Sequence, residues 1–294
     1  MTPTHEPVVS VDHLTVRYGR TSAVDGISLD VPAGSVYALL GRNGAGKSST
    51  VRCLLGQWKP SGGGVRLFGR DVWRERARLM ARVGVVPERA EVPPSMTAGQ
   101  LSRFFAALYA NWDQEAFDIR IDRFTVPRRH PFGKMSKGQQ RQLSLALALA
   151  SQPELLVLDD PTLGLDAVAR RELLEELIGD LSDRGTTVFV ATNDIAGIEG
   201  VADRVGILRG GRLVVDDEVE ALKARLRRIR AAESEEWHLA VPEAEMVATR
   251  RVAGGREAVV SVAATTAETD PRLQPMSLEE IFVALCGPNG GGEA

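Results

Sequence analysis

The sequence predicts an α/β protein whose core is a mostly parallel β-sheet with helices on both faces. Apolar runs that are typical of fully buried strands alternate with segments of helical periodicity. Two segments of alternating polarity near the start of the chain predict antiparallel strands. A helical lobe is expected as an insertion in this core, and a small α+β extension is expected after it.

The core elements are expected in chain order as follows. Antiparallel strands at 8–18 and 23–31 come first. The segment SVYALLGRNGAGKSSTVRCLLG then predicts an apolar strand, a glycine-rich turn and a helix that begins near Lys47. Further buried strands are predicted by the segments RVGVVP, ELLVLD, TTVFVAT and ADRVGILR.

The helical lobe is predicted at about 88–150. Thr97 and Gln100 fit a capping box at the start of TAGQLSRFFAALY, and a second helix is expected near 113–124. Apolar residues recur at helical spacing in the first helix, namely Leu101, Phe104, Phe105 and Leu108. We interpret the aromatic residues of the lobe as packing rather than as a ligand site.

A domain boundary is predicted near Asp216, which divides the chain into 1–216 and 217–294. The segment DDEVEALKARLRRIR predicts one helix whose apolar face carries Val219, Leu222, Leu226 and Ile229. EWHLAVP and EAVVSVAA predict strands, and SLEEIFVALCG predicts a short capped helix. The glycine-rich tail from Gly287 is expected to be disordered.

Composition and charge narrow the class of function. A net charge of −3 does not favour a general nucleic-acid binder, and two cysteines cannot form a disulfide framework, so a reducing cytoplasm is expected. The first residues, MTPTHEPVVS, do not fit a secretion signal, and no apolar run approaches the roughly 18 residues of a membrane span. Any membrane role is therefore expected to go through a partner. The basic run at 223–230 fits a solvated helix face better than a surface for lipid headgroups or a partner.

A phosphate-binding loop is predicted by GRNGAGKS, which fits the pattern G-x-x-x-x-G-K-[ST]. Its glycines let backbone N–H groups point at phosphate oxygens, and the following helix adds its positive N-terminal end. Lys47 would reach the β- and γ-phosphates, and Ser48 would offer its hydroxyl to Mg²⁺. A chance match is disfavoured, because a strand precedes the loop and a helix follows it. The predicted nucleotide-binding residues are Gly41, Arg42, Asn43, Gly44, Ala45, Gly46, Lys47, Ser48 and Ser49.

Two adjacent carboxylates, Asp159 and Asp160, follow the apolar run in LLVLDDPTLGLD. Neighbouring anions repel each other unless a cation or a reaction uses them. We predict that Asp159 lies at the end of a strand beside the phosphate loop and supports Mg²⁺ through its water shell. The alternative is a helix-cap or turn aspartate before Pro161.

A third motif, MSKGQQRQ, precedes the paired carboxylates. Together with GRNGAGKS and LLVLDDP, it resembles the motifs of the ATP-binding cassette (ABC) ATPases over about Val8–Val215. Met135 and Lys137 depart from the usual signature LSGGQ. The resemblance implies a P-loop ATPase core that binds ATP and Mg²⁺.

In that family the signature helix contacts the γ-phosphate of ATP held by the opposite subunit, so that ATP joins two cassettes. The residues that match are Ser136, Gly138 and Gln139. A helix N-terminus aimed at phosphate explains this role physically. The alternative is that Ser136 and Gln139 only form a capping box, which would use N–H groups that phosphate needs.

The resemblance implies roles for further residues. Tyr18 matches the aromatic residue that stacks on adenine, with an ordinary strand aromatic as the alternative. Glu88 stands where most members have a glutamine that senses Mg²⁺ or the attacking water and couples to the membrane partner. Glutamate occurs there in the exporter branch. Asp166 matches an aspartate that crosses the dimer, with a helix N-cap as the alternative.

Two residues depart from the family's catalytic pattern. Asp160 replaces a glutamate that orients or deprotonates the attacking water, and its side chain reaches roughly 1.5 Å less far. Positioning errors of about 1 Å can cost on the order of a hundredfold in rate. Asn193 replaces a switch histidine, and its amide donates a hydrogen bond but carries no positive charge. We therefore expect ordinary nucleotide binding and slow hydrolysis.

The resemblance implies an ATP-hydrolysing subunit of an ABC transporter, with the exporter branch favoured. Such a subunit dimerises around Mg-ATP, as a homodimer or with a different subunit, and drives a separate integral membrane permease. It is expected in the cytoplasm, on the inner face of the cell membrane, with no nucleic-acid partner. The alternatives are a regulatory nucleotide clamp with weak hydrolysis and a soluble ABC protein that acts on ribosomes or DNA.

Overall fold

The central sheet carries the predicted parallel strands. The computed structural model describes residues 6–231, 245–252, 254–263 and 270–287. The strands of the central sheet lie in the order β10 (Arg212–Glu218), β9 (Arg204–Arg209), β3 (Val36–Gly41), β8 (Thr187–Thr192), β7 (Leu155–Asp159) and β6 (Val83–Val86). Every neighbouring pair is parallel except β10 with β9. The mostly parallel core is therefore confirmed, and the carboxyl ends of β3, β8 and β7 meet at one edge of the sheet.

A second sheet contains the predicted antiparallel strands. Its order is β2 (Thr21–Val31), β1 (Val9–Tyr18), β4 (Gly62–Leu67) and β5 (Arg70–Asp71). The sequence did not predict β4, because GGGVRL carries three glycines and little apolar alternation; antiparallel pairing with β1 makes it a strand. Helices α1 (Lys47–Leu54) and α2 (Val72–Met80) follow β3 and β5. Apolar residues of β1 and β2, one face of β3, and α1 form one core.

The helical lobe is present, and its packing differs in part from the prediction. It contains α3 (Ala98–Leu108), α4 (Gln114–Arg123), the 3₁₀ turn η1 (Phe132–Lys134) and α5 (Lys137–Ala150). The capping box at Thr97 and the second helix are confirmed. Leu101 is fully buried, but Phe104 is 52% exposed and Leu108 is 61% exposed. The packing role predicted for the aromatic Phe104 is wrong, because the face of α3 that carries it has no covering element among the described residues.

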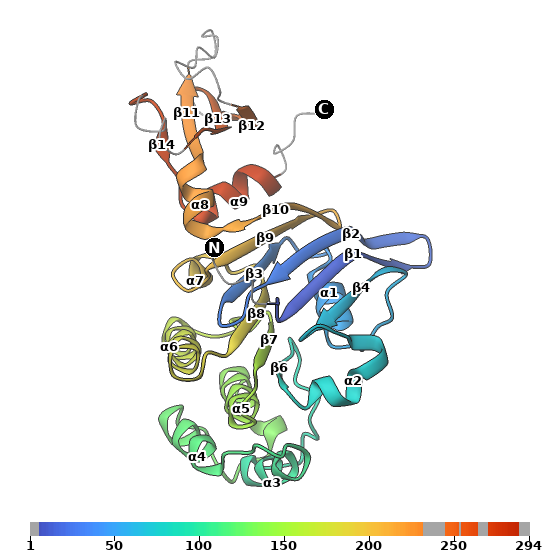
Figure 1. Cartoon of the computed structure of the whole chain (residues 1–294). Helices are drawn as coiled ribbons and strands as arrows, with labels where there is room; N and C mark the ends of the chain where they lie inside the picture. The colour runs from blue at the N-terminus through green and yellow to red at the C-terminus, as the bar shows by residue number, and fades with distance from the viewer. Residues whose placement is uncertain (1–5, 232–244, 253, 264–269, 288–294) are drawn as a thin grey trace.

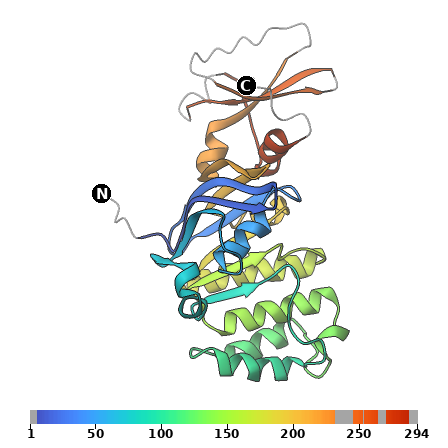
Figure 2. The same cartoon turned by 90° about the vertical axis from the view of Figure 1, so that its right-hand side faces the viewer.

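Two further helices complete the core. They are α6 (Ala167–Arg184), which follows β7, and α7 (Ile195–Ile198), which follows β8. Glu176 of α6 is buried and pairs with Arg120 of α4 at 2.9 Å and with Arg123. This buried ion pair ties the lobe to the core. In both views the lobe lies at one end of the molecule and the C-terminal extension at the other (Figure 1, Figure 2).

In its described residues, the C-terminal extension forms a four-stranded sheet with two helices. Its elements are α8 (Val219–Arg225), β11 (Leu226–Ala231), β12 (Glu245–Val252), β13 (Gly255–Ser261), β14 (Gln274–Pro275) and α9 (Leu278–Cys286). The strand at EAVVSVAA and the capped helix that begins after Ser277 are confirmed. EWHLAVP and most of the glycine-rich tail fall on 232–244 and 288–294, outside the described residues. β10 runs through Asp216, and the division into 1–216 and 217–294 stays a prediction.

The single helix predicted through Ile229 is wrong. The helix α8 ends at Arg225, and β11 pairs with both β13 and β14. Leu226 and Ile229 share a helical face in the sequence pattern, but on the strand they belong to two different apolar clusters. Main-chain pairing with strands far along the chain has overridden the local pattern.

The basic run 223–230 is not a solvated helix face. Lys223 pairs with Glu199 at 3.3 Å, and Arg225 pairs with Asp217 at 2.9 Å. Arg228 and Arg230 both pair with the buried Glu257. Four of the five cations in the run thus have carboxylate partners within the chain, which leaves less free positive charge for lipid headgroups. Within the described part of the chain, we find no helix that is both long and apolar enough to cross a bilayer.

Candidate functional site

The phosphate loop joins a fully buried strand to a helix, as predicted. Gly44 and Gly46 adopt left-handed backbone conformations, with φ of 82° and 112°. Gly46 is also the N-cap of α1, and its lack of a side chain leaves the first N–H groups of the helix open to an external acceptor. Lys47 is only 5% exposed, and its Nζ donates to the carbonyl oxygen of Gly41 at 2.8 Å. The ammonium is thus held over the loop, where it can meet phosphate.

We expect Gly46→Ala to destabilise the fold more than Gly44→Ala does. A Cβ at Gly46 would lie 2.5 Å from the carbonyl oxygen of Ala23, whereas a Cβ at Gly44 would meet nothing within 4 Å. Both changes strain a positive φ, but only the first adds a backbone clash. Chemical denaturation should show a loss of roughly 1–3 kcal/mol in the free energy of unfolding for Gly46→Ala beyond the loss for Gly44→Ala. Equal losses would contradict this account of the turn.

Asp159 and Ser48 form a pair suited to a divalent cation. The Ser48 Oγ lies 3.4 Å from the Asp159 Oδ1, at the junction of α1 and the end of β7. Burial, followed by the charge of Asp160, raises the pKa of Asp159 to about 6. A bound cation would offset this cost of ionisation. One carboxylate, one hydroxyl and substrate phosphates are the ligands that Mg²⁺ usually takes in such sites, so these residues fit the ion.

Asp160 and Asn193 are joined across the sheet edge. Asp160 has a φ of 44°, its N–H donates to the carbonyl oxygen of Ala191 at 2.7 Å, and its Oδ1 accepts the N–H of Asn193 at 3.2 Å. The Asn193 Nδ2 donates to the Asn43 Oδ1 of the phosphate loop at 3.2 Å. Aspartate tolerates a left-handed backbone better than most residues. The turn at the end of β7 therefore directs the Asp160 carboxylate toward Asn193, and Asn193 in turn contacts the phosphate loop.

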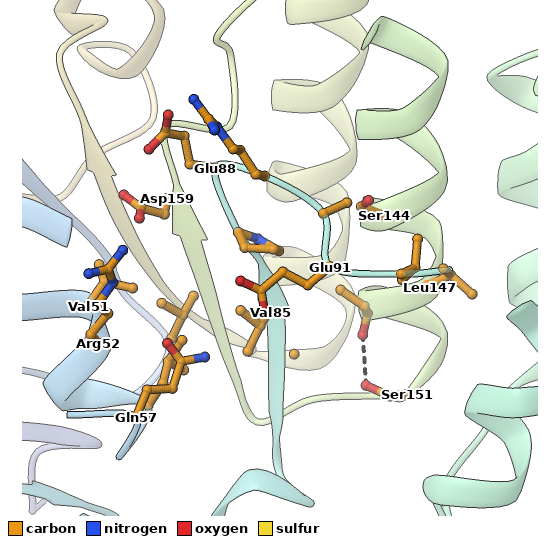
Figure 3. A pocket seen from close by; sticks show the side chains of 18 of the residues that line it. Val51, Arg52, Gln57, Val85, Glu88, Glu91, Ser144, Leu147, Ser151 and Asp159 are labelled. Carbon is orange, nitrogen blue, oxygen red and sulfur yellow. Dashed lines mark hydrogen bonds between the residues drawn. The ribbon is translucent and has the colours of Figure 1, made fainter. Parts of the chain in front are cut away.

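Glu88 lies in a cavity between the core and the lobe. This cavity of about 500 Å³ is lined by Ser48 and Asp159 from the core, and by Phe105 and Tyr109 from the lobe helix and the loop after it. Figure 3 shows Glu88 and Asp159 at the same end of the cavity, and the Glu88 charge contributes to the raised pKa of Asp159. The cavity thus connects the predicted metal site to the lobe.

Arg141 is a site residue that the sequence reasoning missed. It lies buried on α5, and its guanidinium donates to the carbonyl oxygens of Pro87 and Glu88, the latter at 2.8 Å. Burial lowers the pKa of Arg141, while the carboxylates of Asp160, Glu88 and Asp159 oppose that shift. Arg141 therefore holds the Glu88 segment against the lobe and balances the acidic cluster. An arginine just before the apolar run LSLALALA was the signal that could have indicated it.

Comparison with known proteins identifies the family. Residues 24–163 match the family described as ABC transporter. A bacitracin transport ATP-binding protein of Bacillus licheniformis is 32% identical over 223 residues, which make up 75% of this chain and 73% of that protein. The chain belongs to the ABC transporter family. As a member with this phosphate loop, it is a P-loop ATPase that binds ATP.

Other ABC transporter proteins extend the similarity. A fluoroquinolones export ATP-binding protein of Mycobacterium tuberculosis is 36% identical over 225 residues, with 75% of this chain and 74% of that protein covered. A daunorubicin resistance ATP-binding protein of Streptomyces coeruleorubidus is 30% identical over 287 residues, with 96% of this chain and 87% of that protein covered. A solved ATP-binding subunit of an ABC transporter has a TM-score of 0.67 at 23% identity, and the match covers 74% of this chain and 92% of that one. The structural match supports the fold alone.

The ABC signature segment adopts the capping geometry. The Ser136 Oγ accepts the N–H of Gln139 at 3.2 Å, and the Gln139 Oε1 accepts the N–H of Ser136 at 3.0 Å. Gly138 lies beside Leu165, so the signature adjoins the segment that follows the paired carboxylates. No hydrogen bond or ion pair between the described residues joins 136–139 to the phosphate loop of the same chain. Within one ABC subunit, the described residues of the two motifs thus make no such contact with each other.

The two remaining ABC positions, Tyr18 and Asp166, make different local contacts. The Tyr18 hydroxyl lies 3.3 Å from the Ser49 Oγ on α1, and the ring stays 37% exposed. The exposed ring fits both the adenine-stacking aromatic and the ordinary strand aromatic. The Asp166 Oδ1 accepts the N–H of Ala169 at 2.9 Å, so the helix-cap alternative is formed for this residue.

Proposed function

We propose that this chain is the ATP-hydrolysing subunit of an exporter-type ABC transporter and that it drives a separate membrane permease. The observation that carries the proposal is the cavity between core and lobe. It connects the metal pair Ser48 and Asp159 to the lobe through Glu88, and the lobe exposes the apolar residues Phe104 and Leu108. A partner protein bound at this cavity would contact both the lobe and Glu88, which lies at the same end of the cavity as Asp159 (Figure 3). The relatives named for export favour the exporter branch.

The residues around the triphosphate and the metal have defined tasks in this proposal. Lys47 and the loop N–H groups bind the phosphates, and Ser48 and Asp159 hold Mg²⁺, which neutralises phosphate charge. Asp160 orients the attacking water and accepts its proton, while Asn193 donates a hydrogen bond toward the phosphate. The signature of a second copy, or of a related subunit, covers the triphosphate from the other side. Because each copy carries one phosphate loop and one signature, such a pair would complete two sites.

The test is isolation of the chain from solubilised membranes of cells that express it at native level. We expect an integral membrane protein of several spans to co-purify with the chain, and ATP hydrolysis to be faster in that complex than in the isolated chain. Phe104→Ser should weaken the association. Ile178→Ser is the matched control, because Ile178 is also exposed but lies on α6. Recovery of the chain only with ribosomes or DNA would contradict the proposal and support the soluble ABC alternative.

The proposed slow turnover predicts a gain of activity for Asn193→His. An imidazolium would make a charge-assisted contact to phosphate, which is about twice as strong as a neutral hydrogen bond. Steady-state phosphate release by the permease complex should rise roughly tenfold. Asn111→His, at an exposed position, should leave the rate unchanged. If Asn193→His also leaves it unchanged, the proposal that Asn193 limits the rate is wrong.

A further inference from the structure

Two exposed aromatic rings lie beside the phosphate-binding helix. The centroids of Tyr18 and Trp58 are 5.1 Å apart, and their planes are tilted by 51°. Tyr18 is 37% exposed and Trp58 is 40% exposed, although both are large apolar groups that proteins usually bury. The pair therefore presents a continuous aromatic surface to solvent.

Tyr18 and Trp58 are both hydrogen-bonded to α1, the helix that follows the phosphate loop. The Tyr18 hydroxyl reaches the Ser49 Oγ at 3.3 Å, one residue after the predicted Mg²⁺ ligand Ser48. The backbone N–H of Trp58 donates to the carbonyl oxygen of Arg52 at 3.2 Å, near the other end of α1. The strand that ends in Tyr18 and the loop that carries Trp58 are also joined, because the N–H of Arg17 donates to the Ser61 Oγ at 3.1 Å. The aromatic surface is thus fixed relative to the triphosphate site.

We infer that Trp58 positions the ring of Tyr18 and completes an aromatic platform for the nucleobase of the bound nucleotide. A base stacks on such a surface through its π-face, which every base has, so the platform stabilises the base without reading its hydrogen-bonding edge. Trp58 packs against Tyr18 from the loop after α1 and limits the orientations of its ring. This inference rests on the proposed function, because it assumes that the phosphate loop holds a nucleoside triphosphate.

The test compares ligands that share phosphates but differ in the base. Dissociation constants of ATP, GTP and inorganic triphosphate are measured by calorimetry on the full chain. We expect Trp58→Ala to weaken ATP and GTP alike by about 5- to 10-fold and to leave inorganic triphosphate within about twofold. Turnover at saturating ATP should stay unchanged while KM rises. Trp58→Phe should restore most of the affinity.

Two further variants separate a base platform from a structural role. Trp58→Leu keeps apolar bulk but no ring, and it should behave like Trp58→Ala; it also serves if the alanine variant does not fold. Trp73→Ala is the matched control, because Trp73 is 48% exposed and its ring lies 6.0 Å from the Lys59 ammonium, in a separate contact. This control should leave all three ligands unaffected.

The outcomes are distinguishable. Equal weakening of ATP and inorganic triphosphate by Trp58→Ala, or no weakening of ATP, would overturn the inference. If Tyr18→Ala leaves ATP affinity intact while Trp58→Ala lowers it, the positioning of Tyr18 by Trp58 is wrong. If the unaltered chain binds neither ATP nor inorganic triphosphate, the proposed function itself fails.

Discussion

Asp160→Asn is expected to reduce ATP turnover by about 10²- to 10⁴-fold with little change in ATP affinity. The amide cannot accept a proton from water, and removal of a general base typically costs that much in rate. The side chain can still accept the N–H of Asn193 through its carbonyl oxygen, so the local fold should survive. Measurements of phosphate release and of ATP binding on the permease complex test whether turnover falls while ATP affinity is retained.

A second variant tests whether the short side chain of Asp160 limits turnover. Asp160→Glu restores the longer reach, and we expect turnover to rise above that of the unaltered chain. The same change should lower the free energy of unfolding by about 1 kcal/mol, because glutamate tolerates the φ of 44° less well than aspartate. Asp30→Asn, an exposed change on β2, is the control and should alter neither quantity. Unchanged turnover in Asp160→Asn would exclude Asp160 as the base.

Lys47→Met is expected to weaken ATP binding by roughly 10- to 100-fold. The ammonium is buried over the loop at 2.8 Å from the Gly41 carbonyl oxygen, so its loss removes both a charge and a hydrogen-bond donor from the phosphate site. Methionine has a similar length and no charge. The free energy of unfolding should therefore change by less than about 1.5 kcal/mol.

Calorimetric titration of ATP and chemical denaturation of the same samples separate binding from folding. Lys134→Met removes an exposed lysine and is the matched control, for which no change in ATP affinity is expected. A Lys47→Met protein that folds normally and binds ATP as tightly as the unaltered chain would show that the loop is not the phosphate site.

Features set by neighbours along the chain were predictable. The phosphate loop is contiguous, with a strand, a turn that requires glycine, and a helix, so its geometry follows from local backbone preferences. The capping boxes at Thr97 and Ser277 likewise join residues three apart. The buried strands followed from apolar runs, because a strand covered on both faces has no polar side to show.

Features that depend on long-range pairing were not predictable. The segment from Leu226 has a helical pattern, yet pairing with β13 and β14 makes it a strand. The exposure of Phe104 depends on which elements cover α3. The contact of Arg141 with the Glu88 segment joins residues that no local rule connects.

The sequence alone determined the chemistry that this protein has available: a loop for phosphate, two carboxylates, and a signature helix. Only the tertiary structure decided how these groups meet, since the parallel sheet brings the carboxyl ends of β3, β8 and β7 to one edge. There Asp160 faces Asn193, and Asn193 reaches Asn43 from 150 residues away. The sequence sets which side chains are present whatever the fold, whereas the contacts of Asn193 with Asp160 and Asn43 form only when the strands are paired.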